Sequence, residues 1–223
     1  LICFAFIMSF FKKGVIESGI DREKGAKLQG KVMLFLIVWL MVLAILAILG
    51  FFQNLESLPP RPFFAVFCSL LALILLAKNK IYQQIAFGVP PQWILYFQTF
   101  RIPLEIWLWS LFINDIIPVQ ITFEGYHFVI IPAILGPLVA YLVFTKKAAP
   151  IWLAKACNYF GILTVIVIVF IATVSMQSPL RLFDNEPSNT IITFFPYIWL
   201  PGFLVPMALL THVTSLIQLG KKG

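Results

Sequence analysis

An arginine and a glutamate lie at the centre of one long apolar segment, residues 92–113. Arg101 and Glu105 are four positions apart, so both side chains share one face of a helix, and Gln98 precedes the arginine by three positions on that face. About 20 apolar residues are enough to cross a bilayer as a helix. A charge near the middle of such a helix costs about 2.5–3.5 kcal/mol, so we expect both charges to face the protein interior.

Two functions fit this pair of charges. In the first, Arg101 receives a small polar or anionic solute in an intramembrane cavity, with Glu105 tuning the site or carrying a proton and Gln98 nearby. Pro103 removes one backbone hydrogen bond between the charges and frees the carbonyl of Thr99 beside the arginine. In the second, the charges form an internal ion pair that only pins neighbouring helices. The residue types leave both functions open.

A second group of polar residues lies in the loops on one side of the apolar segments. Four of them are candidates for the mouth of the site: Arg61, Glu124, His127 and Glu186. The acids of these loops lack a metal-binding spacing such as HExxH, so we predict no metal site and interpret them as a solvated rim. Arg61 and Arg181 are positioned in sequence to pair with the acids and hold the loops shut.

The composition indicates an integral membrane protein. The chain has 223 residues, of which 61% are hydrophobic and 11% charged, and a soluble domain of this size exposes far more charge. The segments are apolar on every side, unlike the alternating strands of a membrane barrel. We therefore predict an all-α integral membrane helical bundle with a single transmembrane domain over residues 1–223. Its three cysteines lie in apolar segments without a disulfide or metal spacing.

Seven apolar segments are expected to be transmembrane helices. They comprise residues 1–11, 32–52, 63–77, 92–113, 128–144, 150–175 and 190–216. The first would be only about 16 Å long, so we interpret it as the end of a span that begins before Leu1. Residues 12–31 are expected to be a solvated connector. The fifth and seventh segments contain several prolines, and broken helices of this kind are typical of transport sites, although proline also merely bends membrane helices.

The charges of the loops predict the orientation. Most bases fall in one alternate set of loops, including Lys12, Lys13, Arg22, Lys24, Lys27, Lys31, Lys78, Lys80, Lys146, Lys147, Lys155, Lys221 and Lys222. The other set carries Arg61 and Arg181 with most of the loop acids. By the positive-inside rule the N-terminus is outside and the C-terminus inside, which requires an odd number of spans. The net charge of +7 is then explained by topology and anionic lipids, and nucleic acid is not expected as a partner.

Other polar and aromatic residues in the spans have ordinary explanations. His212 and Asn158 are expected to form hydrogen bonds between helices. Tryptophans and tyrosines near span ends are expected to be interface anchors; these are Trp93, Trp152, Tyr197 and Trp199. We find no nucleophile elbow, dinucleotide fingerprint, phosphate-binding loop or zinc spacing. We therefore assign no catalytic residue, predict no cofactor, and keep a membrane-embedded enzyme as the third reading.

Four short motifs resemble a family of uncharacterised bacterial polytopic membrane proteins, with similarity from about Lys12 to Leu219. The motifs are Leu58-Pro59-Pro60-Arg61, Gln98-x-Phe100-Arg101-x-x-x-Glu105, Thr122-Phe123-Glu124-Gly125 and Asn185-Glu186-Pro187. Family members often read Thr-Phe-Glu-Gly-x-Asn-Phe-Asp where this chain has His127 and Val129, and the loss of that carboxylate argues against a metal site. The resemblance implies a multi-pass protein of the bacterial cytoplasmic membrane and no particular activity.

The sequence thus favours a protein that binds or transports a small polar or anionic solute at Arg101, Glu105 and Gln98. The alternative is a non-catalytic assembly or partner subunit in which the charges are structural. The lipid bilayer is the expected partner in either case, and a homo-oligomer stays open.

Overall fold

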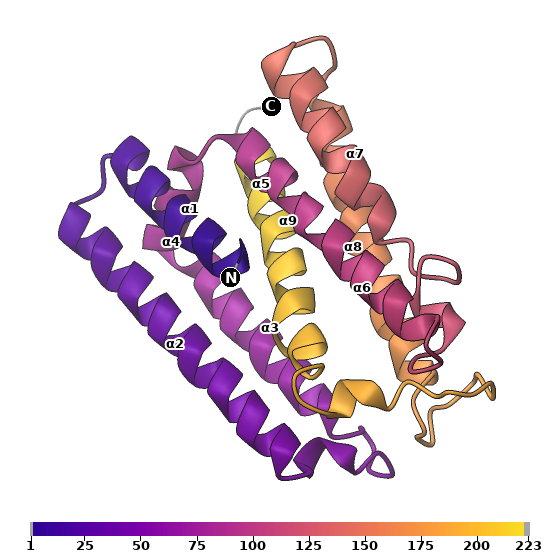
Figure 1. Cartoon of the computed structure of the whole chain (residues 1–223). Helices are drawn as coiled ribbons and strands as arrows, with labels where there is room; N and C mark the ends of the chain where they lie inside the picture. Colours follow the sequence, from indigo (N-terminus) through magenta and orange to yellow (C-terminus); the bar gives the residue numbers. More distant parts are fainter. Residues whose placement is uncertain (1, 221–223) are drawn as a thin grey trace.

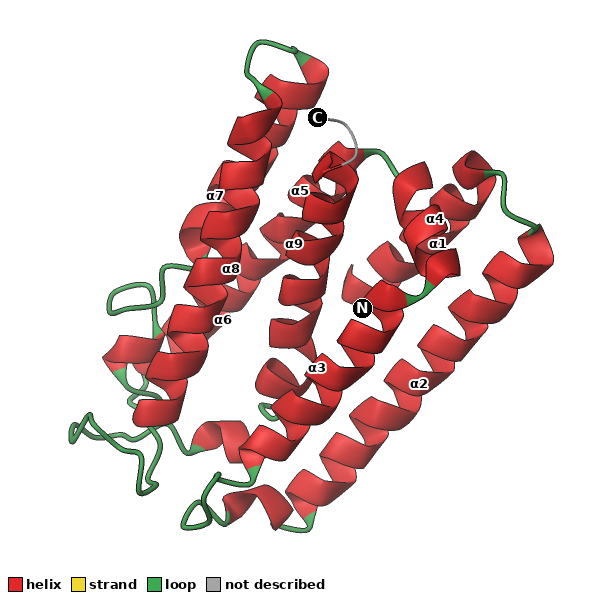
Figure 2. Cartoon of the chain, turned by 180° about the vertical axis from the view of Figure 1, so that it is seen from behind, coloured by secondary structure: helices red, strands yellow, loops and turns green. Residues whose placement is uncertain are grey.

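The computed structural model describes residues 2–220, most of which are helical. The α-helices are α1 (Ile2–Ser18), α2 (Arg22–Ile48), α3 (Pro62–Lys78), α4 (Lys80–Gly88), α5 (Pro91–Phe97), α6 (Arg101–Phe112), α7 (Ile130–Ala140), α8 (Ile151–Val174) and α9 (Val205–Gly220). Six shorter turns join or extend them: the 3-10 turns η1 (Phe51–Gln53), η2 (Gln98–Phe100), η3 (Val119–Ile121) and η5 (Ile191–Thr193), and the π-helical turns η4 (Tyr141–Thr145) and η6 (Leu200–Leu204). No strand occurs in this described part, which confirms the all-α prediction (Figure 2).

Three helices within residues 2–220 are long and apolar enough to cross a membrane. They are Arg22–Ile48, Ile151–Val174 and Leu200–Gly220, and the bent pair α3 and α4 passes the same test if it is counted as one span. The 27 residues of α2 extend about 40 Å, more than the hydrocarbon core of a bilayer. Little of α2 is buried in the bundle, as expected of a helix that faces lipid.

The helices run alternately between two ends of the bundle, called upper and lower as drawn in Figure 1. The connections after α1, α4 and α7 lie in the upper half, and those after α2, α6 and α8 lie at the lower end (Figures 1 and 2). α5, η2 and α6 follow one another without a gap and descend together. α1 covers only part of the height of the bundle.

The polar stretch near the N-terminus, predicted as a solvated connector over residues 12–31, is largely exposed and is mostly helical. α1 continues to Ser18, and α2 begins at Arg22. An ion pair of 2.7 Å between Lys13 and Glu17 supports the last turns of α1. Asp21 caps α2 by accepting a hydrogen bond of 2.8 Å from the backbone N–H of residue 23. Local charge pairs and the cap therefore make this polar sequence helical.

Two further segments differ from the expected spans. Residues 190–199 contain only a short 3-10 turn, and the last helix begins at Leu200. Pro196 and Pro201 deny hydrogen-bond donors to this region, which explains why the helix starts late. After α3, the backbone of Asn79 is extended and its side chain caps α4. A second helix therefore follows at an angle of 74° where the sequence predicted the end of the span. The eighth helix, by contrast, agrees closely with the segment expected over residues 150–175.

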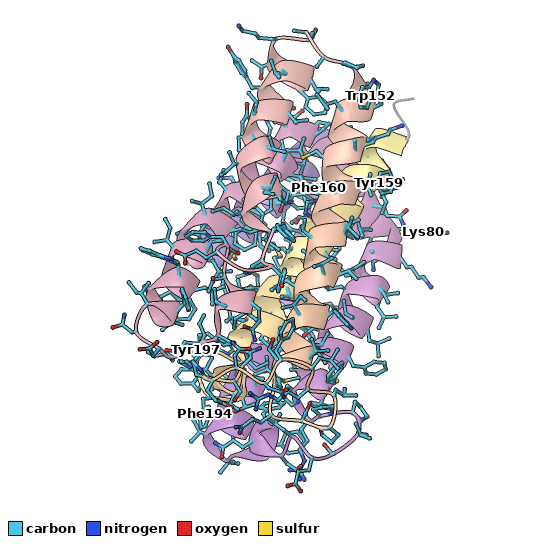
Figure 3. All side chains as sticks on the ribbon, turned by 90° about the vertical axis from the view of Figure 1, so that its right-hand side faces the viewer. Lys80, Trp152, Tyr159, Phe160, Phe194 and Tyr197 are labelled. Atoms are coloured by element: carbon cyan, nitrogen blue, oxygen red, sulfur yellow. The ribbon has the colours of Figure 1, made fainter. Side chains whose placement is uncertain are left out.

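Aromatic side chains lie near both ends of the bundle. Trp152 and Tyr159 extend outward from the upper half of α8, and Phe194 and Tyr197 lie near the lower end (Figure 3). Trp152 is 64% exposed, as an interface anchor requires. Trp199 is half-buried, and its indole donates a hydrogen bond of 3.0 Å to the carbonyl of Leu40.

Candidate functional site

The charged face of the fourth apolar segment lies inside the bundle. The exposed fractions are 1% for Arg101 and 0% for both Glu105 and Gln98. This confirms that both charges face the protein interior. The tight turn η2 immediately precedes Arg101, at the place where Pro103 was expected to loosen the helix by removing a donor.

Arg101 is bound into a chain of buried polar side chains from three helices, which we call the Arg101–Ser215 chain. Its Nη2 lies 3.1 Å from Nε2 of His212 in α9. Nδ1 of His212 lies 3.0 Å from Oδ1 of Asn158 in α8. The Asn158 amide donates hydrogen bonds of 2.9 Å to Oγ of Ser215 and 2.8 Å to the carbonyl of Ala154. The chain thus links α6, α8 and α9.

The chain determines the tautomer of His212. An arginine only donates hydrogen bonds, so Nε2 of His212 accepts and Nδ1 carries the proton. Nδ1 then donates to the Asn158 carbonyl oxygen, which leaves the amide nitrogen to donate to Ser215. Each contact has one donor and one acceptor, so the imidazole is neutral and fully paired.

A glycine makes room for this histidine. Gly161 of α8 faces His212, and a Cβ atom built at Gly161 would overlap the imidazole ring. The close approach of α8 and α9 at this point therefore requires a residue without a side chain.

Arg101 and Glu105 do not form the internal ion pair that one of the two readings expected. The ion pairs among residues 2–220 are Lys13–Glu17, Lys27–Glu23, His127–Glu105 and Arg181–Glu186. Arg101 is instead drawn toward His212, while the loop after α6 brings His127 to Glu105. The shared helix face was correct, but the partners come from other elements.

Glu105 and His127 are close, but no well-directed hydrogen bond joins them. Nδ1 of His127 is 3.1 Å from Oε2 of Glu105 and also 3.1 Å from the carbonyl oxygen of Ile121. Its single N–H satisfies the Ile121 carbonyl, and within the described chain neither oxygen of Glu105 accepts a well-directed hydrogen bond. Nη1 of Arg101 likewise has no partner among the described residues.

These atoms adjoin a pocket of about 130 Å³ between α3, α6, α8 and the segment before α9, here called the Glu105 pocket. Arg101, Glu105 and His127 are among its lining residues, but almost all of the lining surface is apolar, with contributions from Phe63, Ile168, Tyr197 and Leu200. Asn189 also lines it; its side chain is buried, and no described residue donates to its Oδ1. We call Arg101 Nη1, both Glu105 oxygens and Asn189 Oδ1 the unpaired atoms of the lining residues; each is buried among neighbouring atoms.

Gln98 lies outside the lining of this pocket. Its amide nitrogen donates a hydrogen bond of 3.0 Å to Oγ1 of Thr211 in α9. The residue therefore contributes to helix contacts next to the Arg101–Ser215 chain, while its Oε1 has no partner among the described residues. Its place in a solute site with Arg101 and Glu105 stays a prediction.

Only one of the four outer-loop candidates reaches the site. His127 contacts Glu105, as described above. Arg61 donates to the carbonyl of Phe51 at 3.2 Å and its guanidinium lies over the ring of the same residue. Glu124 is exposed and accepts a hydrogen bond of 2.6 Å from the indole of Trp109. Neither Arg61 nor Glu124 lines the Glu105 pocket.

Glu186, the fourth candidate, belongs to an exposed loop. Arg181 donates a hydrogen bond of 2.8 Å to its carboxylate, and the backbone N–H of Ser188 donates another of 2.8 Å. The Arg181 hydrogen bond first, and the Ser188 one second, hold the pKa of Glu186 below its usual value. The expected pairing of Arg181 with a loop acid is thus confirmed, away from the pocket lining.

The two long lower loops are joined by an amide pair that the sequence did not reveal. Gln120 donates to Oδ1 of Asn185 at 3.0 Å, and Asn185 donates back to Oε1 of Gln120 at 2.9 Å. The first loop supplies His127 and the second supplies Asn189 to the pocket wall. The amide pair therefore fixes the two walls relative to one another.

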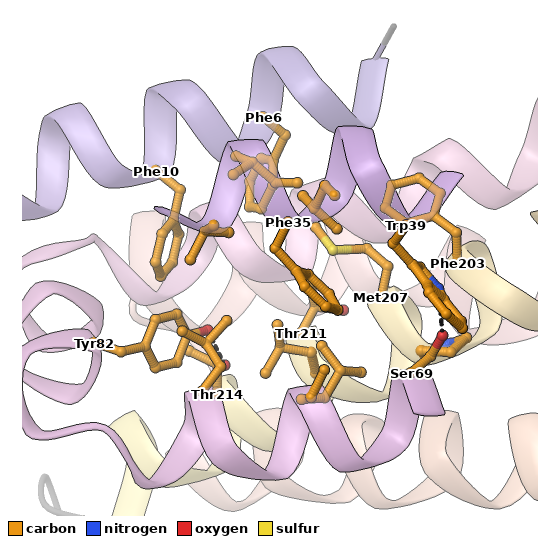
Figure 4. A pocket seen from close by; sticks show the side chains of 18 of the residues that line it. Phe6, Phe10, Phe35, Trp39, Ser69, Tyr82, Phe203, Met207, Thr211 and Thr214 are labelled. Carbon is orange, nitrogen blue, oxygen red and sulfur yellow. Dashed lines mark hydrogen bonds between the residues drawn. The ribbon is translucent and has the colours of Figure 1, made fainter. Parts of the chain in front are cut away.

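A second pocket, of about 70 Å³, lies between α1, α2, α3 and α9. Aromatic and aliphatic side chains line it, including Phe6, Phe35 and Phe203 (Figure 4). Its polar groups are already paired, for example Tyr82 with Thr214 at 2.7 Å. This groove offers an apolar surface only.

Within residues 2–220, no group of three or more histidine, cysteine, aspartate or glutamate side chains is placed to hold a metal ion. No protein-family model, curated protein or solved structure matches the chain. Function therefore has to be inferred from the residues and their geometry.

Proposed function

We propose that the protein binds a small solute within the membrane, in the Glu105 pocket, either as a binding protein or as one step of transport. The observation that carries the proposal is the set of unpaired buried polar atoms on Arg101, Glu105 and Asn189, three residues that line the pocket. Leaving a buried polar atom without a partner costs about 1–3 kcal/mol, and more for a charged group. Native proteins contain few such atoms. A bound solute that pairs with Arg101 and Glu105 together would offset this cost.

The proposal includes a topology of seven membrane segments, with the N-terminus outside and the C-terminus inside a bacterial cytoplasmic membrane. Its support is the separation of charge between the two ends of the bundle. Arg22 and Lys80 are the first residues of α2 and α4 in the upper half, and Lys146 follows η4 there, whereas Glu124 and Glu186 belong to the lower loops. Lys221 and Lys222 lie outside the described residues. In this orientation the Glu105 pocket faces the outer half of the membrane.

Cysteine labelling in intact cells tests this orientation. A cysteine at Asp184 should react with a membrane-impermeant reagent added from outside, and one at Lys146 should react only after the membrane is permeabilised. The reverse pattern would overturn the orientation.

The second candidate function is a partner or assembly subunit whose buried polar groups are structural. The Arg101–Ser215 chain favours it, because the three contacts Arg101–His212, His212–Asn158 and Asn158–Ser215 are satisfied and tie three helices together. That chain accounts for Nη2 of Arg101. It does not account for Nη1 or for Glu105.

A matched pair of variants tests solute binding. Thermal unfolding in lipid nanodiscs would be measured with a panel of small solutes for the wild type, Glu105→Leu and the control Glu124→Leu. A solute of the site should stabilise the wild type and the control, but not Glu105→Leu. The double variant Arg101→Met with Glu105→Leu should also lose the effect. Equal stabilisation of all four proteins would remove the pair from the site.

A further inference from the structure

The second pocket, between α1, α2, α3 and α9, has an apolar interior whose polar groups are already paired. At one end, the Trp39 indole donates hydrogen bonds of 2.9 Å to Oγ of Ser69 and 3.0 Å to the carbonyl of Gly202. At the other end, Tyr82 is paired with Thr214 at 2.7 Å (Figure 4). A polar group placed between these ends would lose its hydrogen bonds with water and gain none. The interior therefore suits hydrocarbon.

This pocket is partly open toward the outside of the bundle. Phe35, which lies across its middle in Figure 4, is 45% exposed, and the lining residues Leu36 and Leu73 are only half-buried. The helix that carries Phe35 is little buried in the bundle and is long enough to cross a membrane. We call this pocket the Phe35 groove. Its open side faces the bilayer, so lipid chains can enter it laterally.

The dimensions of the Phe35 groove fit one thin chain. Its volume is about 70 Å³, about half that of an apolar cavity that holds benzene. Its lining residues on α2 run from Val32 to Trp39, a rise of about 10 Å along the helix. One leaflet contributes about 15 Å of hydrocarbon. A single acyl chain of that leaflet therefore matches the groove better than a ring does.

Three exposed lysines lie at the upper end of the Phe35 groove. Lys31 directly precedes a lining residue of α2, and Lys78 and Lys80 are each two positions from a lining residue at the junction of α3 and α4. Lys80 extends outward from the bundle (Figure 3). None of the three has an ion-pair partner among residues 2–220, and the nearby acids Glu17 and Glu23 are paired with other lysines. The groove thus ends in uncompensated positive charge.

We infer that the Phe35 groove is a binding site for an anionic phospholipid, separate from the Glu105 pocket. One acyl chain lies in the groove, the second chain stays in the bilayer along the open side, and the phosphate lies among Lys31, Lys78 and Lys80. Each basic residue near a membrane surface strengthens the binding of anionic lipid about fivefold. The apolar groove positions the chain, and the lysines select the charge of the headgroup.

Lipid titration followed by native mass spectrometry tests the headgroup. The full chain in detergent would be titrated with phosphatidylglycerol, phosphatidylcholine of the same chains, oleate and inorganic phosphate, and the dissociation constant of the first bound molecule would be measured. Phosphatidylglycerol should bind about tenfold or more tightly than phosphatidylcholine, and phosphate alone should not bind. The triple variant Lys31→Gln, Lys78→Gln and Lys80→Gln should lose this preference.

The matched control removes three bases that do not adjoin the groove, Lys146→Gln, Lys147→Gln and Lys155→Gln, and should keep the preference. Equal binding of the two phospholipids by the wild type, or equal effects of the two triple variants, would overturn the headgroup assignment. Oleate that binds as tightly as phosphatidylglycerol would show that the ligand is a fatty acid and not a phospholipid.

A second pair of variants tests the groove. Ala72 lines it, and Ala72→Phe should displace at least two methylene groups and weaken both phospholipids about tenfold. The control Leu163→Phe changes a residue of α8 that is 55% exposed and should have no effect. Should Ala72→Phe not fold, Ala72→Leu replaces it with the same direction of change. Lipid binding that is equal in the Ala72 variant and the control would overturn the placement of the chain in the Phe35 groove.

Discussion

The two terminal nitrogens of Arg101 face different surroundings. On the side of Nη2, the Arg101–Ser215 chain pairs every contact between α6, α8 and α9. Nη1, by contrast, has no partner among the described residues, and neither do the buried polar atoms of Glu105 and Asn189, which with Arg101 line the Glu105 pocket. A satisfied buried network rigidifies and positions helices, whereas a partly satisfied one is costly unless a ligand completes it. The contrast supports an architectural role for one side of Arg101 and the proposed solute binding for the other.

The largest loss of stability is expected from a substitution at Gly161, which lies against the Arg101–Ser215 chain. Gly161→Ala should destabilise the protein by about 3 kcal/mol, because the added methyl group overlaps His212 and disrupts the chain. Denaturant unfolding in a defined detergent would measure the change. The matched control is Gly30→Ala in α2, where an added Cβ meets nothing within 4 Å. Equal stability of the two variants would show that α8 and α9 do not meet as described.

A smaller loss is expected when one link of the chain is removed. Asn158→Leu leaves the Nδ1 proton of His212 without its acceptor and should cost about 2 kcal/mol. Asn114→Leu serves as the control, because Asn114 is exposed and bonds only within its own turn. The same unfolding assay applies. A stability loss no greater than that of the control would mean that the chain does not hold the helices together.

Removing the carboxyl group of Glu105, by contrast, should lower the free energy of unfolding little or not at all. Glu105→Leu eliminates a buried carboxyl group whose oxygens lack well-directed hydrogen bonds within residues 2–220, so we expect stability to be unchanged or raised by about 1 kcal/mol in the absence of solute. A loss as large as that of Asn158→Leu would place Glu105 in the architecture instead of the binding site.

The smallest effect is expected in the exposed loop, away from both regions. Because the folded pKa of Glu186 is lowered, its contribution is present above the usual value of 4.5 and is lost as pH falls through the folded pKa. The stability difference between wild type and Glu186→Gln should therefore be constant near neutral pH and shrink below pH 4.5. Unfolding curves from pH 7 to pH 3 would measure it, and a difference that grows on acidification would contradict the assigned pairing.

Much of this arrangement could be predicted where the signal is local. The span of α8 follows from an apolar run bounded by Pro150, and the burial of Arg101 and Glu105 follows from the cost of charge in a membrane. The late start of the last helix was missed because the prolines at 196 and 201 were interpreted as bends within a span. The chain partners were harder to foresee. His212 is 111 positions from Arg101, and a lone histidine in an apolar helix does not indicate its partner.

The sequence also could not distinguish the Nη2 atom of Arg101, which joins the Arg101–Ser215 chain, from the Nη1 atom, which has no partner among the described residues. That separation depends on which nitrogen meets which helix, and on the loop that brings His127 to Glu105 while its N–H serves the Ile121 carbonyl. Whether the Glu105 carboxylate accepts a hydrogen bond depends on how α6, His127 and Ile121 meet in space, and the pattern of one helix face does not predict this. Gln98 shows the same limit, because its position on the charged face did not predict its bond to Thr211.

An experimental structure of the protein in lipid nanodiscs, at a resolution that shows side chains and waters, tests the central claim most directly. We predict density for a solute larger than water within hydrogen-bonding distance of both Nη1 of Arg101 and the carboxyl group of Glu105. The same density should be missing from Glu105→Leu. A direct ion pair between Arg101 and Glu105, with the pocket closed by protein side chains, would contradict the proposal that these residues bind a solute.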